Sequence, residues 1–373
     1  MNDKLGFGTM RLPVSDSSCD QSIDTEIFTE MIDRFINAGF FYFDTALFYC
    51  GGNSEIALRK CLVERYQRHK FWITDKLPSS SLLSSMSCEN IFQTQLQKLG
   101  LRFFDCYMLH NVNSSTLSTF NAFDAFSFVA EKKKSGEAKT IGFSFHDSPE
   151  LLDTILTEHP EIDFVQLQIN YLDWEDPVIQ SKNCYNVATK HEKPVIVMEP
   201  IKGGSLAQLP SDVFEKLHII NPAASSASWA LRFAASLSNV RIVLSGMSNA
   251  FQVNDNIITF TKLPCLSIEE KQLLSQVARE ISGKKAIPCS NCAYCVQVCK
   301  TGIPIPQFFA LYNADCLEHP SKKRRPQRRY YKNLSLKYCS ATRCILCKRC
   351  EQVCPQKLPI VDLLVSVASR FED

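Results

Sequence analysis

Eight cysteines near the end of the chain are spaced for metal binding. They form two copies of the run C-x2-C-x2-C-x3-C: Cys289, Cys292, Cys295 and Cys299, then Cys344, Cys347, Cys350 and Cys354. Thiolates at such short intervals can converge on one inorganic centre. The chain has 17 cysteines in 373 residues, whereas disulfide scaffolds are short secreted proteins. Metal ligation is therefore the better interpretation.

This spacing resembles that of bacterial ferredoxins, in which the fourth cysteine of each run ligates the other cluster. The resemblance implies two [4Fe-4S] clusters that transfer electrons. Zinc is the alternative metal, but zinc sites use paired C-x2-C units rather than runs of four. The expected ligands are Cys289, Cys292, Cys295 and Cys354 for one cluster, and Cys344, Cys347, Cys350 and Cys299 for the other.

The first 250 residues alternate apolar runs of β type with segments of helical period, which is the pattern of repeated βα units. Helices are expected over 27–38, over 88–99 after Ser87, and after Ser148, where residue types suit helix ends. The pattern predicts an α/β fold, a (β/α)8 TIM barrel, with a doubly wound open sheet as the alternative. The eight runs begin at Gly6, Phe41, Phe71, Cys106, Thr140, Phe164, Pro194 and Arg241.

Four polar residues stand at the ends of the second, third and fourth runs, where a barrel carries its chemistry. They are Asp44, Tyr49, Lys76 and His110. At these positions the sequence resembles the aldo-keto reductases: FDTALFY carries the family's Asp and Tyr, ITDKLP its Lys and YMLHNV its His. The whole chain is similar to members of that family with a C-terminal ferredoxin-type extension. The resemblance implies an NAD(P)-dependent oxidoreductase.

The four residues suit carbonyl reduction. Such a reduction needs a proton at the developing alkoxide, and tyrosine, with a pKa of about 10, is a weak acid unless its anion is stabilised. Lys76, paired with Asp44, is expected to lower the pKa of Tyr49. His110 is expected to donate a hydrogen bond to the carbonyl oxygen.

The resemblance also implies a nicotinamide site for NADP or NAD. Phe145 stands where the family has an Asn, and Glu199 where it has the tyrosine that stacks on the nicotinamide ring. Lys202 with Gly203 forms a plausible phosphate loop, because glycine lets backbone amides approach an anion. The residues expected to bind the cofactor are Ser144, Gln168, Lys202, Gly203, Ser245, Gln252 and Asn256.

Charge divides the chain near residue 280. Residues 281–373 hold 16 Lys and Arg against 6 Asp and Glu, and the remainder holds 25 against 33. We expect a barrel over 1–265, a connector helix over 266–283 and a small, mostly helical ferredoxin-like domain over 284–373. The basic run around residues 322–332 is expected to be a flexible arm or a docking surface for an acidic redox partner, rather than a nucleic-acid site.

The start of the chain lacks a signal sequence and no long apolar run occurs, so a cytoplasmic protein without a membrane span is expected.

Three hypotheses follow. The first is an oxidoreductase that acts on a small carbonyl or alcohol and carries [4Fe-4S] clusters for electron transfer. The second is an iron-sulfur electron-transfer protein whose barrel is a docking or regulatory scaffold. The third is a barrel enzyme whose clusters are structural. Nicotinamide moves two electrons and each cluster one, so a direct path between them needs a flavin, a radical or a partner. No flavin motif is visible, and a flavin remains open.

Overall fold

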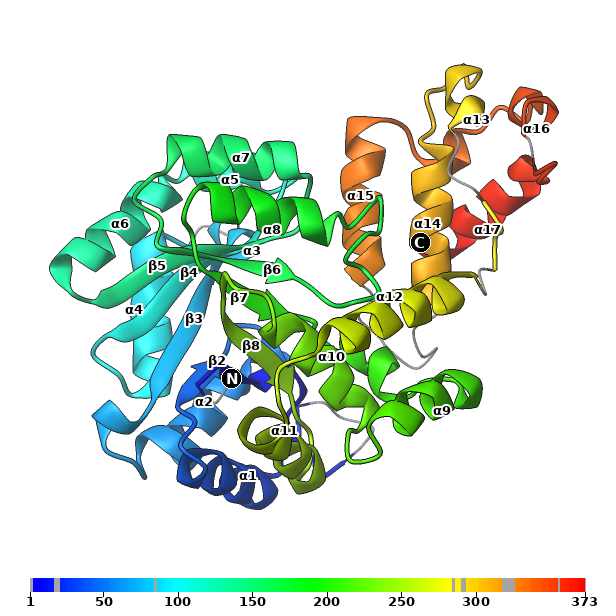
Figure 1. Ribbon diagram of the computed structural model, residues 1–373. Coiled ribbons are helices and arrows are strands. Elements are labelled where there is room, and N and C mark those ends of the chain that lie inside the picture. Colours follow the sequence, from blue (N-terminus) through cyan, green and yellow to red (C-terminus); the bar gives the residue numbers. More distant parts are fainter. Residues whose placement is uncertain are drawn as a thin grey trace.

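Eight parallel strands close into a barrel in this computed structural model, which describes residues 3–16, 21–83, 86–283, 286–289, 293–316, 326–354 and 356–372 (Figure 1). Each strand pairs with the next, and the first pairs with the last. The barrel prediction is therefore confirmed, and the open-sheet alternative is wrong. The strands are β1 Leu5–Gly8, β2 Tyr42–Asp44, β3 Trp72–Pro78, β4 Phe104–Val112, β5 Ala138–Phe145, β6 Phe164–Gln168, β7 Val195–Met198 and β8 Val240–Gly246.

Helices surround the barrel. The ends expected for the helix over 88–99 and the start expected after Ser148 are confirmed, whereas the helix expected over 27–38 begins two residues earlier and ends one residue earlier. In α4 (Cys88–Leu99), Ser87 Oγ accepts a hydrogen bond from the backbone N–H of Asn90 at 3.1 Å, and Gly100 ends the helix in the left-handed region with φ of 69°. Asp24 and Ser148 cap α1 (Thr25–Asn37) and α7 (Pro149–Glu158) in the same way. The others are α2 Ser54–Leu58, α3 Ser79–Leu83, α5 Leu117–Ala122, α6 Ala125–Ser135, α8 Ser181–Lys190, α9 Ser211–Ile220, α10 Ser226–Ala235 and α11 Ala250–Lys262.

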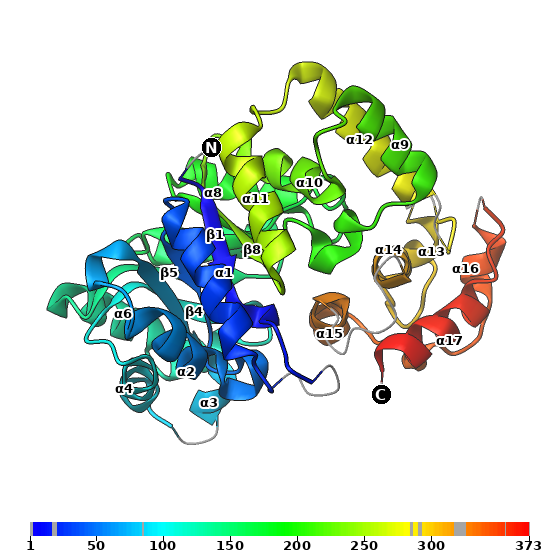
Figure 2. The same cartoon turned by 90° about the horizontal axis from the view of Figure 1, so that it is seen from below.

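The chain beyond the barrel is helical among the described residues, as expected. A connector, α12 (Ile268–Gly283), leads to α13 (Tyr294–Gln297), α14 (Ile305–Cys316), α15 (Pro326–Lys337), α16 (Arg349–Gln352) and α17 (Ile360–Phe371). In both views α15 lies between the barrel and α14 (Figures 1 and 2). No helix among the described residues is long and apolar enough to cross a membrane.

Helix α15 packs on the barrel and on the tail at once. Tyr330 meets His146, just after β5, with ring centroids 6.1 Å apart, and Asn333 Nδ2 donates to His146 O at 3.2 Å. The next tyrosine, Tyr331, packs between Phe308 of α14 and Phe371 of α17. Residues 317–325 of the basic run lie outside the described residues. From Pro326 onward the expectation of a flexible arm is wrong, because buried tyrosines fix this part as a helix.

Candidate active site

The four predicted catalytic residues meet at the carboxyl ends of neighbouring strands. Asp44 is the last residue of β2, Lys76 lies in β3 and His110 in β4. Tyr49 begins a short 3-10 turn, Tyr49–Gly52, after β2. Because β2, β3 and β4 are adjacent and parallel, their ends bring these side chains to one rim of the barrel.

A buried ion pair forms the base of the site. Lys76 Nζ lies 2.5 Å from Asp44 Oδ1 and donates to Thr45 O at 2.6 Å. Gln166 Nε2 donates to Asp44 Oδ2 at 3.1 Å, so both oxygens of the carboxylate have partners. Burial disfavours the charge on Lys76 and is the largest single effect. The interactions with Asp44, Tyr49 and Asp75 together outweigh burial and raise the pKa of Lys76. Lys76 is therefore a fixed cation at neutral pH.

Tyr49 lies over this cation and beside His110. Lys76 Nζ is 4.8 Å from the centroid of the Tyr49 ring, and the Tyr49 and His110 rings meet edge to face at 6.1 Å. Burial raises the pKa of Tyr49, and the charge of Lys76 opposes this shift only in part. Lys76 lowers the pKa of Tyr49, as expected, but burial is the larger effect and the net pKa is raised.

A cavity of about 910 Å³ opens over the site. This volume is in the usual range for a small-molecule or cofactor site. Its wall includes Asp44, Tyr49 and His110 of the catalytic set. Of the predicted cofactor residues, the wall includes Ser144, Gly203, Ser245, Gln252 and Asn256.

Most of the predicted cofactor side chains are held in place by hydrogen bonds. Ser144 Oγ accepts from the backbone N–H of Asn111 at 2.7 Å. Ser245 Oγ accepts from Asn256 Nδ2 at 2.7 Å, and both residues are buried. Gln252 Oε1 accepts from the backbone N–H of Ser248 at 2.7 Å. These polar groups are therefore fixed before any ligand arrives.

Gln168 and Lys202 share one buried partner, Asp173. Gln168 Nε2 donates to Asp173 Oδ2 at 2.9 Å, and Lys202 Nζ lies 2.6 Å from Asp173 Oδ1. Gln168 Oε1 is buried and has no hydrogen-bond partner among the described residues, which suits an amide donor from a ligand. The ammonium of Lys202 is 1% exposed and already neutralised by Asp173. Its expected role in phosphate binding stays a prediction.

The sequence interpretation missed several polar residues of the cavity wall, among them Gln166, His146 and Arg329. Gln166 could have been found, because it is two residues before Gln168 on one strand and so shares its face. Burial, with the nearby charge of Arg329, lowers the pKa of His146 well below its usual value and keeps the ring neutral. Arg329 belongs to α15, and no local pattern places it in the barrel.

In the tail, three cysteines surround a small cavity. Cys289, Cys295 and Cys354 line it together with apolar side chains such as Ile305 and Phe309. These are three of the four ligands expected for one cluster, and the fourth, Cys292, lies outside the described residues. No group of three or more His, Cys, Asp or Glu side chains poised to hold a metal ion is present in the described ranges, which omit Cys292.

The two cysteine runs repeat one another in structure at an offset of 55 residues, the separation of Cys295 and Cys350. Helices α14 and α17 have 12 residues each, and α13 and α16 have four each. Ala293 and Lys348, which precede the short helices, both have left-handed backbones, with φ of 63° and 55°. Cys295 and Cys350 are each 7% exposed. The described parts of the two runs are therefore equivalent in backbone structure.

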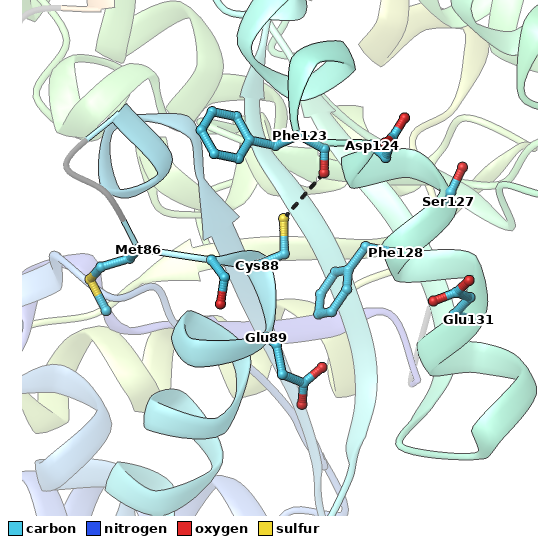
Figure 3. A pocket seen from close by; sticks show the side chains of 9 residues that line it. Met86, Cys88, Glu89, Phe123, Asp124, Ser127, Phe128 and Glu131 are labelled. Carbon is cyan, nitrogen blue, oxygen red and sulfur yellow. Dashed lines mark hydrogen bonds between the residues drawn. The ribbon is translucent and has the colours of Figure 1, made fainter.

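A second groove lies on the outer side of the barrel, between the start of α4 and α6 (Figure 3). There Cys88 Sγ donates to Phe123 O at 3.7 Å. Glu89 on this groove forms an ion pair with Lys132. None of the predicted site residues lines the groove, so the cavity at the strand ends is the candidate active site. The lining residues are Met86, Ser87, Cys88, Glu89, Phe123, Asp124, Ser127, Phe128 and Glu131.

Comparisons with known proteins agree with this architecture. The model of the Aldo/keto reductase family matches residues 4–278. A comparison with curated proteins finds no match. Among solved structures, the chain is similar to aldo-keto reductase AKR11C1 from Bacillus halodurans in its holo form, with 20% identity and a TM-score of 0.55 over 74% of this chain and 91% of that one.

Two further solved structures are similar. An aldo-keto reductase from Klebsiella pneumoniae in complex with NADPH has 16% identity and a TM-score of 0.59 over 74% of this chain and 95% of that one. The thermostable aldo-keto reductase Tm1743, in complex with the inhibitor epalrestat, has 22% identity and a TM-score of 0.56 over 73% and 94%. At these identities the similarity to solved structures shows the fold.

Proposed function

Because the chain belongs to the aldo/keto reductase family and is thus an oxidoreductase, we propose that its barrel interconverts a small carbonyl compound and an alcohol with NADPH. The observation that carries the proposal is the buried Lys76–Asp44 ion pair, which lies under the ring of Tyr49 and beside His110 at the floor of the cavity. The solved structure of the Klebsiella pneumoniae relative contains NADPH.

In the proposed reduction, a bound nicotinamide supplies the hydride and the chain supplies the proton. His110 orients the carbonyl oxygen, and Tyr49 Oη donates its proton to that oxygen as the alkoxide develops. The positive charge of Lys76 stabilises the tyrosinate that remains. Asp44 keeps Lys76 charged and in place.

Several residues fit a nicotinamide cofactor. Ser144 and the unpartnered Oε1 of Gln168 suit the carboxamide group, which has both a donor and an acceptor. Gly203, with φ of 62°, lets backbone amides approach a phosphate. Ser245, Gln252 and Asn256 lie on the same cavity wall and suit the remainder of the cofactor.

The test is reduction of an aromatic aldehyde by NADPH with wild type and Tyr49→Phe. Removing the phenolic proton is expected to lower kcat by about 10²- to 10⁴-fold while NADPH binding, measured by fluorescence, is retained. Tyr338→Phe is the matched control, because Tyr338 is exposed on the tail. A Tyr49→Phe protein that reduces aldehydes as fast as wild type would falsify the proposal.

We also propose that residues 284–373 hold two [4Fe-4S] clusters, with residues 1–265 as the barrel and 266–283 as the connector. The cavity lined by Cys289, Cys295 and Cys354 supports one site, since it joins the first run to the last cysteine of the second as the ferredoxin spacing requires. The repeated backbone of the two runs supports a second, equivalent site. Such clusters supply one-electron transfer when bound.

The second proposed site reaches the surface. Cys347 is exposed, as are its neighbours Lys348 and Leu346. One-electron exchange is fastest where a cluster is near the protein surface, so we propose that an acidic redox partner docks at this basic edge.

Metal analysis tests the clusters. Anaerobically purified protein is expected to contain about eight iron and eight sulfide per chain. In Cys347→Ser both values are expected to fall to about four, because one ligand of one cluster is lost without disturbing a buried side chain. Cys265→Ser, at an exposed cysteine outside both runs, is the control. Zinc in place of iron would contradict the proposal.

A further inference from the structure

Two arginines from the tail, Arg328 and Arg329, line the cavity of the barrel. Arg328 is exposed and its Nη2 donates to Arg370 O at 3.3 Å. Arg329, on α15, is part of the cavity wall together with Tyr49, His110, His146 and Glu199. It is partly buried. The cysteine-bearing part of the chain therefore contributes a side chain to the site built by the barrel strands.

Arg329 is a cation with unused donors. Burial lowers the pKa of its guanidinium, and the negative charge of Glu199 opposes that shift. The group still stays charged, because arginine has a pKa above 12 in water. In the described part of the chain Arg329 has neither a hydrogen-bond nor an ion-pair partner for its guanidinium. Five N–H donors in a rigid fork thus remain available in a partly dehydrated cavity.

The charge of Arg329 acts on the catalytic end of the cavity. It opposes the rise in the pKa of Tyr49, and it helps to lower the pKa of His146. Ser245, Gln252 and Asn256, the residues that suit the adenine end of the cofactor, lie instead at β8 and α11. An anion bound by Arg329 therefore lies close to the proton donor.

Packing holds Arg329 in place. The residues that follow it, Tyr330 and Tyr331, are 5% and 3% exposed and anchor α15 to the barrel and to the tail respectively. Asn333, one turn further, donates to the backbone of His146. The backbone that carries Arg329 is therefore set by both parts of the molecule.

We propose that Arg329 binds a carboxylate of the substrate, so that the barrel selects aldehydes or ketones that carry a carboxylate near the carbonyl. This inference rests on the proposed function and names its substrate class. A guanidinium can donate parallel hydrogen bonds to both oxygens of a carboxylate, which would also orient the carbonyl toward Tyr49 and His110.

The test compares charged and neutral substrates of the same shape. The 2-, 3- and 4-carboxybenzaldehydes and their methyl esters are reduced with NADPH by wild type, Arg329→Lys and Arg329→Met. For the best carboxylated isomer, Arg329→Met is expected to lower kcat/KM by about 10- to 100-fold, and Arg329→Lys by less. For the methyl ester, kcat/KM of either variant is expected to differ from that of wild type by less than about threefold. Lys332→Gln removes a charge from the exposed face of the same helix and is the control.

A second measurement separates this inference from the proposed function. Benzoate binding in the presence of NADP⁺, measured by calorimetry, is expected in wild type and lost in Arg329→Met, whether or not an aldehyde is turned over. If Arg329→Met lowers kcat/KM equally for the carboxylated aldehyde and for its methyl ester, the inference is overturned, because Arg329 then acts through Tyr49. If Arg329→Met raises KM for NADPH and leaves benzoate binding unchanged, the inference is also overturned, because Arg329 then binds a phosphate of the cofactor.

Discussion

At the scale of single residues, the catalytic chemistry depends on the balance between burial and charge at Tyr49. The ion pair below the ring favours ionisation of the phenol, and the loss of water around it opposes ionisation. Burial prevails, so the phenol keeps its proton at neutral pH. The free site is therefore ready to donate a proton, which is the state that reduction needs.

The pH dependence of the two reaction directions tests this balance. Because burial raises the pKa of Tyr49 above its ordinary value, kcat/KM for aldehyde reduction is expected to be level from about pH 7 and to fall only above about pH 10. Alcohol oxidation needs the ionised phenol as a base, so its rate is expected to rise over the same range. A reduction rate that falls with a midpoint near pH 7 would show that Tyr49 loses its proton near neutral pH, which would contradict a raised pKa.

The sequence could predict which four residues meet at the strand ends, because each lies at or just after the end of a strand with its own apolar pattern. It could not predict that Asp173 neutralises Lys202, because that pair depends on how the segments after β6 and β7 fold over each other. Arg329 was missed for a related reason. Its place in the cavity wall depends on how the next residues, Tyr330 and Tyr331, pack against parts of the chain that are distant in sequence.

At the scale of elements, the barrel depends on close contact between neighbouring strands. Gly142 of β5 pairs with Phe164 of β6, and a Cβ atom at Gly142 would lie 2.6 Å from both the backbone oxygen and the ring of Phe164. Phe164 belongs to a buried cluster with Met108, Ile196 and Ile242. The strand therefore needs glycine here for reasons of space.

Gly142→Ala is expected to lower the free energy of unfolding by about 1–3 kcal/mol, because the backbone of β6 cannot move away without disturbing this cluster. The measurement is chemical denaturation followed by circular dichroism. Gly246→Ala is the control, since the nearest atoms to its added Cβ are 3.9 Å away. Equal stability of the two variants would show that β6 can shift.

All eight strands could be predicted, because an apolar run that is buried on both faces is a strong local signal. Helix α15 could not be recognised, since its sequence is mostly polar and basic and lacks a long apolar stripe of helical period. It is held by a few tyrosines and an asparagine that meet partners from two different parts of the fold.

At the scale of the whole molecule, residues of the tail and of the barrel line the same cavity. Ile179, from the segment after β6, is buried in the hydrophobic core of the tail with Ile303 and Phe308. Helix α15 packs against α14, and through Tyr331 against α17, the two helices that follow the cysteine runs. The position of Arg329 therefore depends on the folded state of the cysteine-bearing tail.

Removal of the proposed clusters with ferricyanide and a chelator is expected to lower kcat/KM for a carboxylated aldehyde by about 10- to 100-fold, the range expected for loss of the Arg329 charge. NADPH binding is expected to persist, because its residues lie on the barrel. The kinetics are measured before and after anaerobic reconstitution. Unchanged activity in iron-free protein would show that the tail keeps its shape without metal.

The 55-residue repeat of the tail has a consequence for how this arrangement can vary. In their described residues, 289–316 and 344–371 correspond to each other at this offset. Helix α15 falls in the interval between them. The segment that joins the tail to the barrel is therefore separate in sequence from both cysteine runs, so its side chains can change without altering the spacing of the cysteines.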